Sequence, residues 1–277
     1  MSARSHAVQP VASFHDAALS FGHRSLWQGL NLDIQPGEYI AVLGGNGTGK
    51  TSLLRVLLGL QRLSHGSVQV AGHPARRGST DIGYVPQQRA FDDRTPLRGR
   101  DLVGMGLDGH RWGLRALGRR AHRAKVESLL ERVGALDYAD APVGELSGGE
   151  QQRLRVAQAL ATDPGLLLFD EALLSLDLRR QQQLASLVAE QRDRTGAAVL
   201  FVTHDVNPII DDVDRVLYLA NGSFRIGAPS EVLRSEVLSD LYGTRVEVMN
   251  AAGRVLVVGT EVLDHCHAPE RPEGVVL

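Results

Sequence analysis

The chain lacks the features that would cross-link it covalently or embed it in a membrane. Its 277 residues contain a single cysteine, Cys266, so no intrachain disulfide is possible and a reducing compartment is expected. No apolar run approaches the roughly 18 residues of a membrane-spanning helix, and the N-terminal residues have no apolar signal-peptide core. We therefore predict a soluble, cytoplasmic protein that needs a partner for any role at a membrane.

A strong excess of charge is absent as well. The net charge is −2 at pH 7, which argues against non-specific binding to nucleic acid, and no nucleic-acid partner is expected. Lysine is scarce: of 30 basic residues, only Lys50 and Lys125 are lysine, and the others are arginine. A chain that uses arginine almost everywhere nevertheless places a lysine in a glycine-rich segment, which makes that segment the first functional candidate.

This glycine-rich segment joins a predicted buried strand at residues 39–43 to a predicted helix at 52–58. Its residues are Gly44, Gly45, Asn46, Gly47, Thr48, Gly49, Lys50 and Thr51, followed by Ser52. They match the phosphate-binding pattern GxxxxGK[ST], the P-loop, between a strand and a helix. Backbone N–H groups can converge there on an anion, and a lysine ammonium fits among phosphate oxygens better than a planar guanidinium. We predict nucleotide binding, with Lys50 on the β- and γ-phosphates and Thr51 on Mg²⁺; the alternative is a turn that binds nothing.

Two carboxylates follow a second apolar strand, predicted at residues 166–169. They belong to Asp170 and Glu171. In a parallel sheet, ligands bind beyond the carboxyl ends of the strands, which would place both carboxylates beside the P-loop. We predict that Asp170 orients Mg²⁺ and that Glu171 polarises the attacking water. The alternative is an ordinary strand that runs into solvent.

Residues 146–153 are predicted to form a second glycine-rich loop that opens a helix. Ser147 is a good N-cap, and Glu150 three residues later completes a capping-box pattern. Capping explains these two residues but not the paired glycines Gly148 and Gly149 between them. The loop is therefore a second candidate for binding an anion through free backbone N–H groups.

The sequence Leu-Ser-Gly-Gly-Glu-Gln-Gln-Arg at 146–153 resembles the signature loop of ATP-binding-cassette (ABC) ATPases. It stands between a P-loop and an Asp-Glu strand, as in that family, and the resemblance extends over about residues 14–240. The resemblance implies an ATPase that binds ATP and Mg²⁺. It also implies that two subunits pack head to tail, so that each ATP lies between the P-loop of one copy and Ser147, Gly148 and Gly149 of the other.

The same resemblance assigns four further positions. Phe21 corresponds to the aromatic residue that stacks on adenine, with simple core packing as the alternative. Gln87 corresponds to the glutamine that senses Mg²⁺ and couples to membrane subunits, with Gln88 as the alternative. Asp177 corresponds to the aspartate that communicates across the dimer, and His204 to the histidine that contacts the γ-phosphate.

Catalytic and metal-binding roles follow from these assignments. The expected catalytic residues are Lys50, Glu171 and His204, and the expected Mg²⁺ ligands are Thr51, Gln87 and Asp170. The chain departs from the family at residues 172–176, which are mostly apolar where a proline and then a small polar residue are usual. The catalytic positions are intact, so hydrolysis is still expected, but because this loop is more apolar than in the family the detail of the dimer contacts does not carry over.

The alternation of strand-like and helical segments predicts an α/β fold, a P-loop NTPase core with a mostly parallel sheet. Antiparallel strands are expected before it, at residues 16–21 and 30–34. Strand-like alternation disappears at about 89–162, which predicts an inserted helical subdomain. The ATPase domain is expected to span residues 12–245, and residues 246–277 to form an antiparallel hairpin outside the core and a tail. Within the insertion, helical spacing of apolar residues predicts an amphipathic helix, at Val126, Leu129, Leu130 and Val133.

Residues 241–249 and 253–259 look like the tail of ATPases from bacterial zinc and manganese importers, with siderophore-iron importers as the next match. This resemblance implies a motor subunit held at the inner face of the cell membrane by permease subunits, in a system that includes a solute-binding protein. His265, Cys266 and His267 add soft ligand atoms, in either a metal site or an inert tail. The alternatives are an ABC ATPase for another substrate, an exporter included, and a soluble ABC ATPase outside transport.

Overall fold

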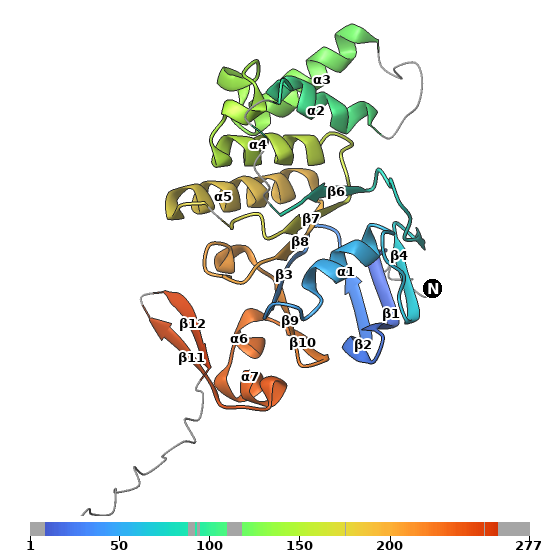
Figure 1. Ribbon diagram of the computed structural model, residues 1–277, viewed down its shortest axis with the longest axis vertical. Helices are drawn as coiled ribbons and strands as arrows, with labels where there is room; N and C mark the ends of the chain where they lie inside the picture. The colour runs from blue at the N-terminus through green and yellow to red at the C-terminus, as the bar shows by residue number, and fades with distance from the viewer. Residues whose placement is uncertain are drawn as a thin grey trace, which may run out of the picture.

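The computed structural model describes residues 9–87, 92, 95–109, 118–174, 176–251 and 253–259. Strands in this part of the chain form three sheets of six, four and two strands. Helices cover both faces of the six-stranded sheet (Figure 1). Residues of α1 form one buried cluster with one face, and residues of α4 and α5 form another with the opposite face. The structure confirms the predicted α/β fold with a mostly parallel central sheet.

The central sheet has the strand order β10-β9-β3-β8-β7-β6, and all neighbouring strands are parallel except β9 and β10. Its strands are β3 (Tyr39–Gly44), β6 (Ile82–Val85), β7 (Leu166–Asp170), β8 (Ala198–Val202), β9 (Arg215–Ala220) and β10 (Ser223–Gly227). β7 and β8 are buried along their whole length, as expected for central strands covered on both faces. The carboxyl ends of β3, β7 and β8 meet at one end of the sheet, where ligands bind in such folds.

Helix α1 (Lys50–Leu57) packs against both the central sheet and a second, antiparallel sheet of order β2-β1-β4-β5. The strands of this sheet are β1 (Ala12–Phe21), β2 (Arg24–Ile34), β4 (His65–Val70) and β5 (His73–Pro74). Both strands begin earlier than predicted: β1 begins at Ala12, which pairs with Ile34, and β2 begins at Arg24, which pairs with Phe21 across a tight turn. Trp27 is fully buried in the shared cluster, with its ring edge against Phe14.

The described chain between residues 95 and 162 is helical and contributes no strand to the sheets. Its elements are α2 (Gly99–Asp108), α3 (Arg119–Arg132), the short η1 (Leu136–Tyr138) and η2 (Val143–Glu145), and α4 (Gly148–Ala159). Val126, Leu129 and Leu130 of α3 are buried, which confirms the apolar stripe expected for this helix. The bounds of the insertion and of the whole ATPase domain remain predictions.

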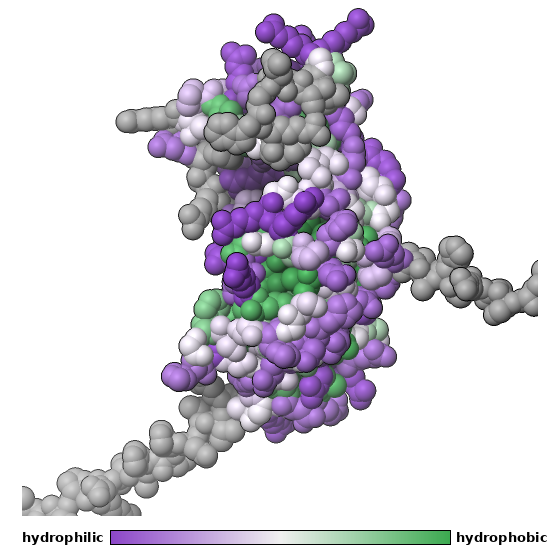
Figure 2. Space-filling model, turned by 90° about the vertical axis from the view of Figure 1, so that its right-hand side faces the viewer, coloured by the Kyte–Doolittle hydropathy of each residue, from purple (hydrophilic) through white to green (hydrophobic). Residues whose placement is uncertain are grey.

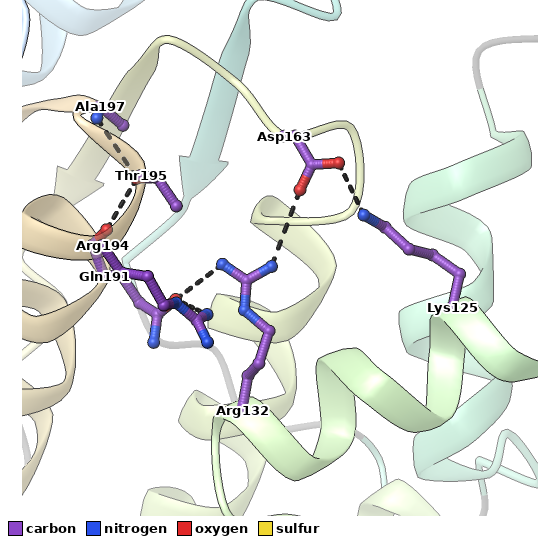
Figure 3. Close-up of polar contacts among 7 residues, drawn as sticks. All are labelled: Lys125, Arg132, Asp163, Gln191, Arg194, Thr195 and Ala197. Carbon is purple, nitrogen blue, oxygen red and sulfur yellow. Dashed lines mark hydrogen bonds and ion pairs between the residues drawn. The ribbon is translucent and has the colours of Figure 1, made fainter.

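Charged and amide side chains fasten α3 to its neighbours (Figure 3). Lys125 Nζ lies 2.6 Å from one oxygen of Asp163, and Arg132 Nη1 lies 3.7 Å from the other. Arg132 Nη2 also donates to Oε1 of Gln191 on α5 (Leu178–Thr195), at 2.7 Å. Because Asp163 lies between α4 and β7 whereas Gln191 belongs to a helix packed on the central sheet, these contacts hold α3 to both parts of the fold.

The C-terminal part contains elements that the sequence did not indicate. They are η3 (Ile210–Asp212), β10, α6 (Pro229–Val232) and α7 (Ser235–Tyr242). The predicted antiparallel hairpin is confirmed as β11 (Val246–Ala251) and β12 (Arg254–Gly259), with a shorter turn than expected because Ala251 pairs with Arg254. The hairpin is not wholly outside the core, since Val246 is buried in the core cluster and Val248 and Val255 pack against it.

The surface is polar over most of the face that carries β1, β4 and α1, and apolar residues gather near its centre (Figure 2). Among the described residues, no helix is long and apolar enough to cross a membrane.

Candidate functional site

The P-loop connects β3 to α1 in a backbone conformation that requires glycine. Gly44 and Gly49 have φ angles of +140° and +100°, in the region that side chains rarely adopt. A Cβ on Gly44 would lie 2.2 Å from the carbonyl oxygen of Leu219, and a Cβ on Gly49 would lie 2.9 Å from Nε1 of Trp27. Gly49 is also the N-cap of α1, and no side chain caps this helix. Its first N–H groups are therefore left for another acceptor.

Lys50 opens α1 and folds back over the loop. Its Nζ donates to the carbonyl oxygens of Gly44 and Gly45, at 2.7 and 2.9 Å. The side chain is 5% exposed, and burial lowers the pKa of Lys50, while the nearby carboxylates of Glu171 and Asp170 oppose that shift. The ammonium thus donates hydrogen bonds to two neutral carbonyl oxygens, and charged phosphate oxygens would be stronger acceptors for it.

Thr51 and Asp170 meet at the carboxyl end of β7. Thr51 Oγ1 donates to Oδ1 of Asp170 at 3.0 Å, and the hydroxyl of Tyr84 donates to Oδ2 at 3.3 Å. Burial raises the pKa of Asp170, and these two hydrogen bonds act in the opposite direction. Burial, followed by the negative charge of Asp170, raises the pKa of Tyr84 to about 12. Sequence reasoning missed the role of Tyr84, which showed only as part of a short strand.

Glu171 lies at the same end of the sheet, within reach of Gln87. Gln87 Nε2 donates to Oε2 of Glu171 at 2.9 Å. The backbone of Glu171 has a φ of +49°, which is uncommon for a residue with a side chain. Its N–H donates to the carbonyl oxygen of Val202 on β8, so the strand pairing helps to hold it there.

A cleft of about 490 Å³ brings most of the predicted nucleotide site together. Its lining residues are Phe21, Arg24, Leu26, Asn46, Gly47, Gly49, Lys50, Thr51, Ser52, Gln87 and Glu171. Phe21 is 56% exposed at the rim, which rules out the alternative that it serves only to pack the core. Arg24, which sequence reasoning missed, donates from Nη2 to the carbonyl oxygen of Gly47 at 3.1 Å and so braces the loop. The alternative to Gln87, Gln88, lies outside the described residues.

The second glycine-rich loop, at residues 146–153, lies outside the P-loop cleft. Its cavity of about 150 Å³ includes Ser147, Gly149 and Arg180 and shares no lining residue with the P-loop cleft. Ser147 caps α4 in a complete capping box: Glu150 N–H donates to Ser147 Oγ at 3.4 Å, and Ser147 N–H donates to Glu150 Oε2 at 2.8 Å. Asp177 caps α5 by accepting from the N–H of Arg180 at 2.9 Å, close to this loop.

His204 also stands apart from the cleft. It is exposed, two residues beyond the end of β8, and lines a separate cavity of about 580 Å³ with Gly44, Gly45 and residues of β12. The structure thus places His204 near Gly44 and Gly45 of the P-loop, but not in the cleft that Glu171 lines. The candidate ligands His265, Cys266 and His267 lie outside the described residues, and the described part of the chain has no group of three or more histidine, cysteine, aspartate or glutamate residues that could hold a metal ion.

Several known proteins are similar to this chain in sequence or in structure. Residues 27–174 match the ABC transporter family. The zinc import ATP-binding protein ZnuC of Halorhodospira halophila is 33% identical over 247 residues, covering 89% of this chain and 88% of that protein. The manganese transport system ATP-binding protein MntB of Halalkalibacterium halodurans is 32% identical over 251 residues, covering 91% and 99%. A solved inward-facing ABC transporter described as metal-chelate type matches with a TM-score of 0.76 and 26% identity, over 91% of this chain and 98% of that chain. This chain therefore belongs to the ABC transporter family, as an ATP-binding subunit.

Proposed function

We propose that this chain hydrolyses ATP to drive the import of a metal ion, zinc or manganese. One observation carries the hydrolytic part: a phosphate loop, a buried lysine and two carboxylates converge at one end of the central sheet. The metal part is supported by two similar proteins, which are named for zinc and manganese transport and which cover 89% and 91% of this chain.

In this proposal, Glu171 is the general base for hydrolysis. Its carboxylate accepts a proton from the attacking water, and the hydrogen bond from Gln87 orients it toward the cleft. Lys50 exchanges its two carbonyl partners for oxygens of the β- and γ-phosphates. Phe21 stacks on adenine at the rim, and His204 contacts the γ-phosphate from the other side of the loop.

The donor set at the carboxyl end of β7 fits Mg²⁺, which prefers oxygen ligands. Thr51 Oγ1 and Asp170 Oδ1 lie 3.0 Å apart, and the Nε2 of Gln87 is engaged with Glu171, which leaves the amide oxygen of Gln87 as a further ligand. We assign the metal to Thr51, Gln87 and Asp170. When bound, Mg²⁺ supplies neutralisation of the phosphate charge.

A second copy of the chain would complete the site. Ser147, Gly148 and Gly149 lie at a cavity of their own, so in a head-to-tail dimer they would approach the ATP held by the other copy, with Asp177 close by. Ser147→Arg should leave ATP binding by the monomer intact and prevent the ATP-dependent dimer, measured by light scattering. Ser223→Arg, at an exposed position of β10, is the matched control and should dimerise normally. Normal dimerisation of Ser147→Arg would exclude this arrangement.

We propose that integral permease subunits and an extracytoplasmic solute-binding protein complete the system, and that the permease holds this chain at the inner face of the membrane. Cells that carry Glu171→Gln in place of the native chain should contain less zinc or manganese and should grow poorly with a chelator of these metals. Normal metal content and normal growth under chelation would reject metal import. A defect restricted to iron chelates would point to siderophore-iron import instead. Failure to co-purify with any permease would favour an ABC ATPase outside transport.

A further inference from the structure

Asn207 joins the segment after β8 to the C-terminal hairpin. Its Nδ2 donates to the carbonyl oxygen of Val255 at 3.0 Å, and its Oδ1 accepts from the N–H of Val255 at 2.7 Å. In a strand, the N–H and C=O of one residue point to the same edge, and Val255 lies on β12. Asn207 therefore occupies the edge of β12 that faces away from β11, as a neighbouring strand would.

The same carboxamide is tied to the residues beside His204. Asn207 Nδ2 also donates to Oδ1 of Asp205 at 2.7 Å, and the N–H of Asn207 donates to the same oxygen at 2.9 Å. Asp205 in turn accepts from Thr203 Oγ1 through its carbonyl oxygen, at 2.8 Å. Both N–H groups and the oxygen of the carboxamide are thus engaged, so that the turn containing His204 and the edge of β12 share one side chain.

His204 and β12 also border the same space. The cavity of about 580 Å³ is lined by Gly44 of the P-loop, by His204 and Asn207, and by Val255 and Leu256 of β12. A displacement of β12 therefore changes the wall that faces His204 and reaches its backbone through Asn207. The connection is short, because only Asp205 and Val206 separate His204 from Asn207.

The other strand of the hairpin offers a contact of the same kind without this connection. Ser239 Oγ on α7 donates to the carbonyl oxygen of Val246 at 3.1 Å and accepts from its N–H at 2.9 Å. This contact holds β11 to α7, whereas the contact of Asn207 holds β12 to the turn of His204. The two residues form a natural pair for comparison.

We propose that Asn207 is a positioning residue: it couples the C-terminal hairpin to His204, so that the attachment of β12 sets the position of His204 beside the P-loop. The proposal rests on the proposed function in one respect, the contact of His204 with the γ-phosphate. It adds a role for the hairpin in the ATPase cycle, as the element against which the histidine is held.

The test compares Asn207→Ala with Ser239→Ala in the full-length chain. Asn207→Ala should lower kcat for ATP hydrolysis by roughly 3- to 10-fold and change KM for ATP less than about twofold, because the loop that binds the nucleotide is untouched. Ser239→Ala should leave both values within about twofold, although it removes as many hydrogen bonds from the hairpin. Equal losses of kcat in the two variants would overturn the proposal, because they would show a general effect of loosening the hairpin.

A second measurement reports on His204 directly. In protein labelled with ¹⁵N-histidine, the imidazole signal of His204 is assigned by its loss in His204→Ala. This signal should shift in Asn207→Ala and also in Val255→Pro. The proline removes the N–H that donates a hydrogen bond to Asn207 Oδ1 but removes no hydrogen bond between β11 and β12. An unchanged His204 signal in both variants would overturn the coupling, even if hydrolysis depended on His204. Full hydrolysis by His204→Ala would instead remove the assumed role of the histidine, which is a failure of the proposed function.

Discussion

The two glycine-rich loops of this chain each lead into a helix, but the N-termini of the two helices are capped differently. The P-loop leads into α1 through Gly49 in a left-handed conformation, and no side chain caps the helix. The second loop leads into α4 through Ser147, which closes a capping box with Glu150. The first helix therefore presents free N–H groups and Lys50 to a cleft of about 490 Å³, whereas the second satisfies part of its N-terminus internally and borders only about 150 Å³. A helix N-terminus becomes a phosphate site where its own side chains leave it open.

The largest effect on ATP hydrolysis is expected at Glu171, the carboxylate that lines the P-loop cleft. Glu171→Gln should slow ATP hydrolysis by roughly 10²- to 10⁴-fold, because an amide cannot accept the proton from water. Nucleotide binding should remain, and the ATP-bound dimer should accumulate. Glu150→Gln is the matched substitution in the second loop; its amide oxygen can still accept from Ser147, so turnover should change little. Similar turnover in the two variants would remove Glu171 from the role of general base.

The two lysines provide the next test. Lys50→Ala should weaken ATP binding by roughly 10- to 100-fold, because charge-assisted hydrogen bonds to phosphate are each worth about 1.5–3 kcal/mol. Lys125→Ala removes the same group from the ion pair with Asp163 (Figure 3) and should leave the dissociation constant for ATP unchanged. Isothermal titration calorimetry measures both. Equal affinity of Lys50→Ala and the native chain would contradict phosphate binding by this loop.

A smaller effect is expected from a change in the backbone of the P-loop, at Gly49. Gly49→Ala forces a side chain into a φ of +100° and places its Cβ 2.9 Å from Nε1 of the buried Trp27. We expect the free energy of unfolding to fall by about 1–3 kcal/mol, measured by urea denaturation. The change should also lower ATP affinity, because the loop and the helix N-terminus move together. Native stability in this variant would mean that the loop relaxes without cost.

The smallest effect is expected at Ser147 of the second glycine-rich loop. Ser147→Ala removes the Oγ that accepts from the N–H of Glu150, and the loss of such a cap costs about 1 kcal/mol of stability. ATP binding by the monomer should not change, since Ser147 does not line the P-loop cleft. A loss of ATP affinity in monomeric Ser147→Ala would mean that the two loops of one chain act on the same nucleotide.

The elements that the sequence predicted well are those determined by local pattern. Strands β3 and β7 were predicted to within one residue of their observed bounds, because continuous apolar runs between turn residues mark buried parallel strands. The elements that it missed, α6 and α7, are short, and α7 is stabilised by packing Leu238 and Leu241 into the core rather than by a strong local signal. The hairpin was predicted, but its attachment through Val246 was not, because burial depends on which surface lies opposite.

The same division holds at the candidate site. The sequence alone indicated the candidates for phosphate binding and hydrolysis, because a glycine pattern, a lysine at a helix start and carboxylates after an apolar run are all features of the local sequence. Only the tertiary structure decided their partners: Thr51 with Asp170, Gln87 with Glu171, and Asn207 with Val255. Each pair joins segments far apart in sequence, whose approach follows from sheet order and helix packing and leaves no trace in a local pattern.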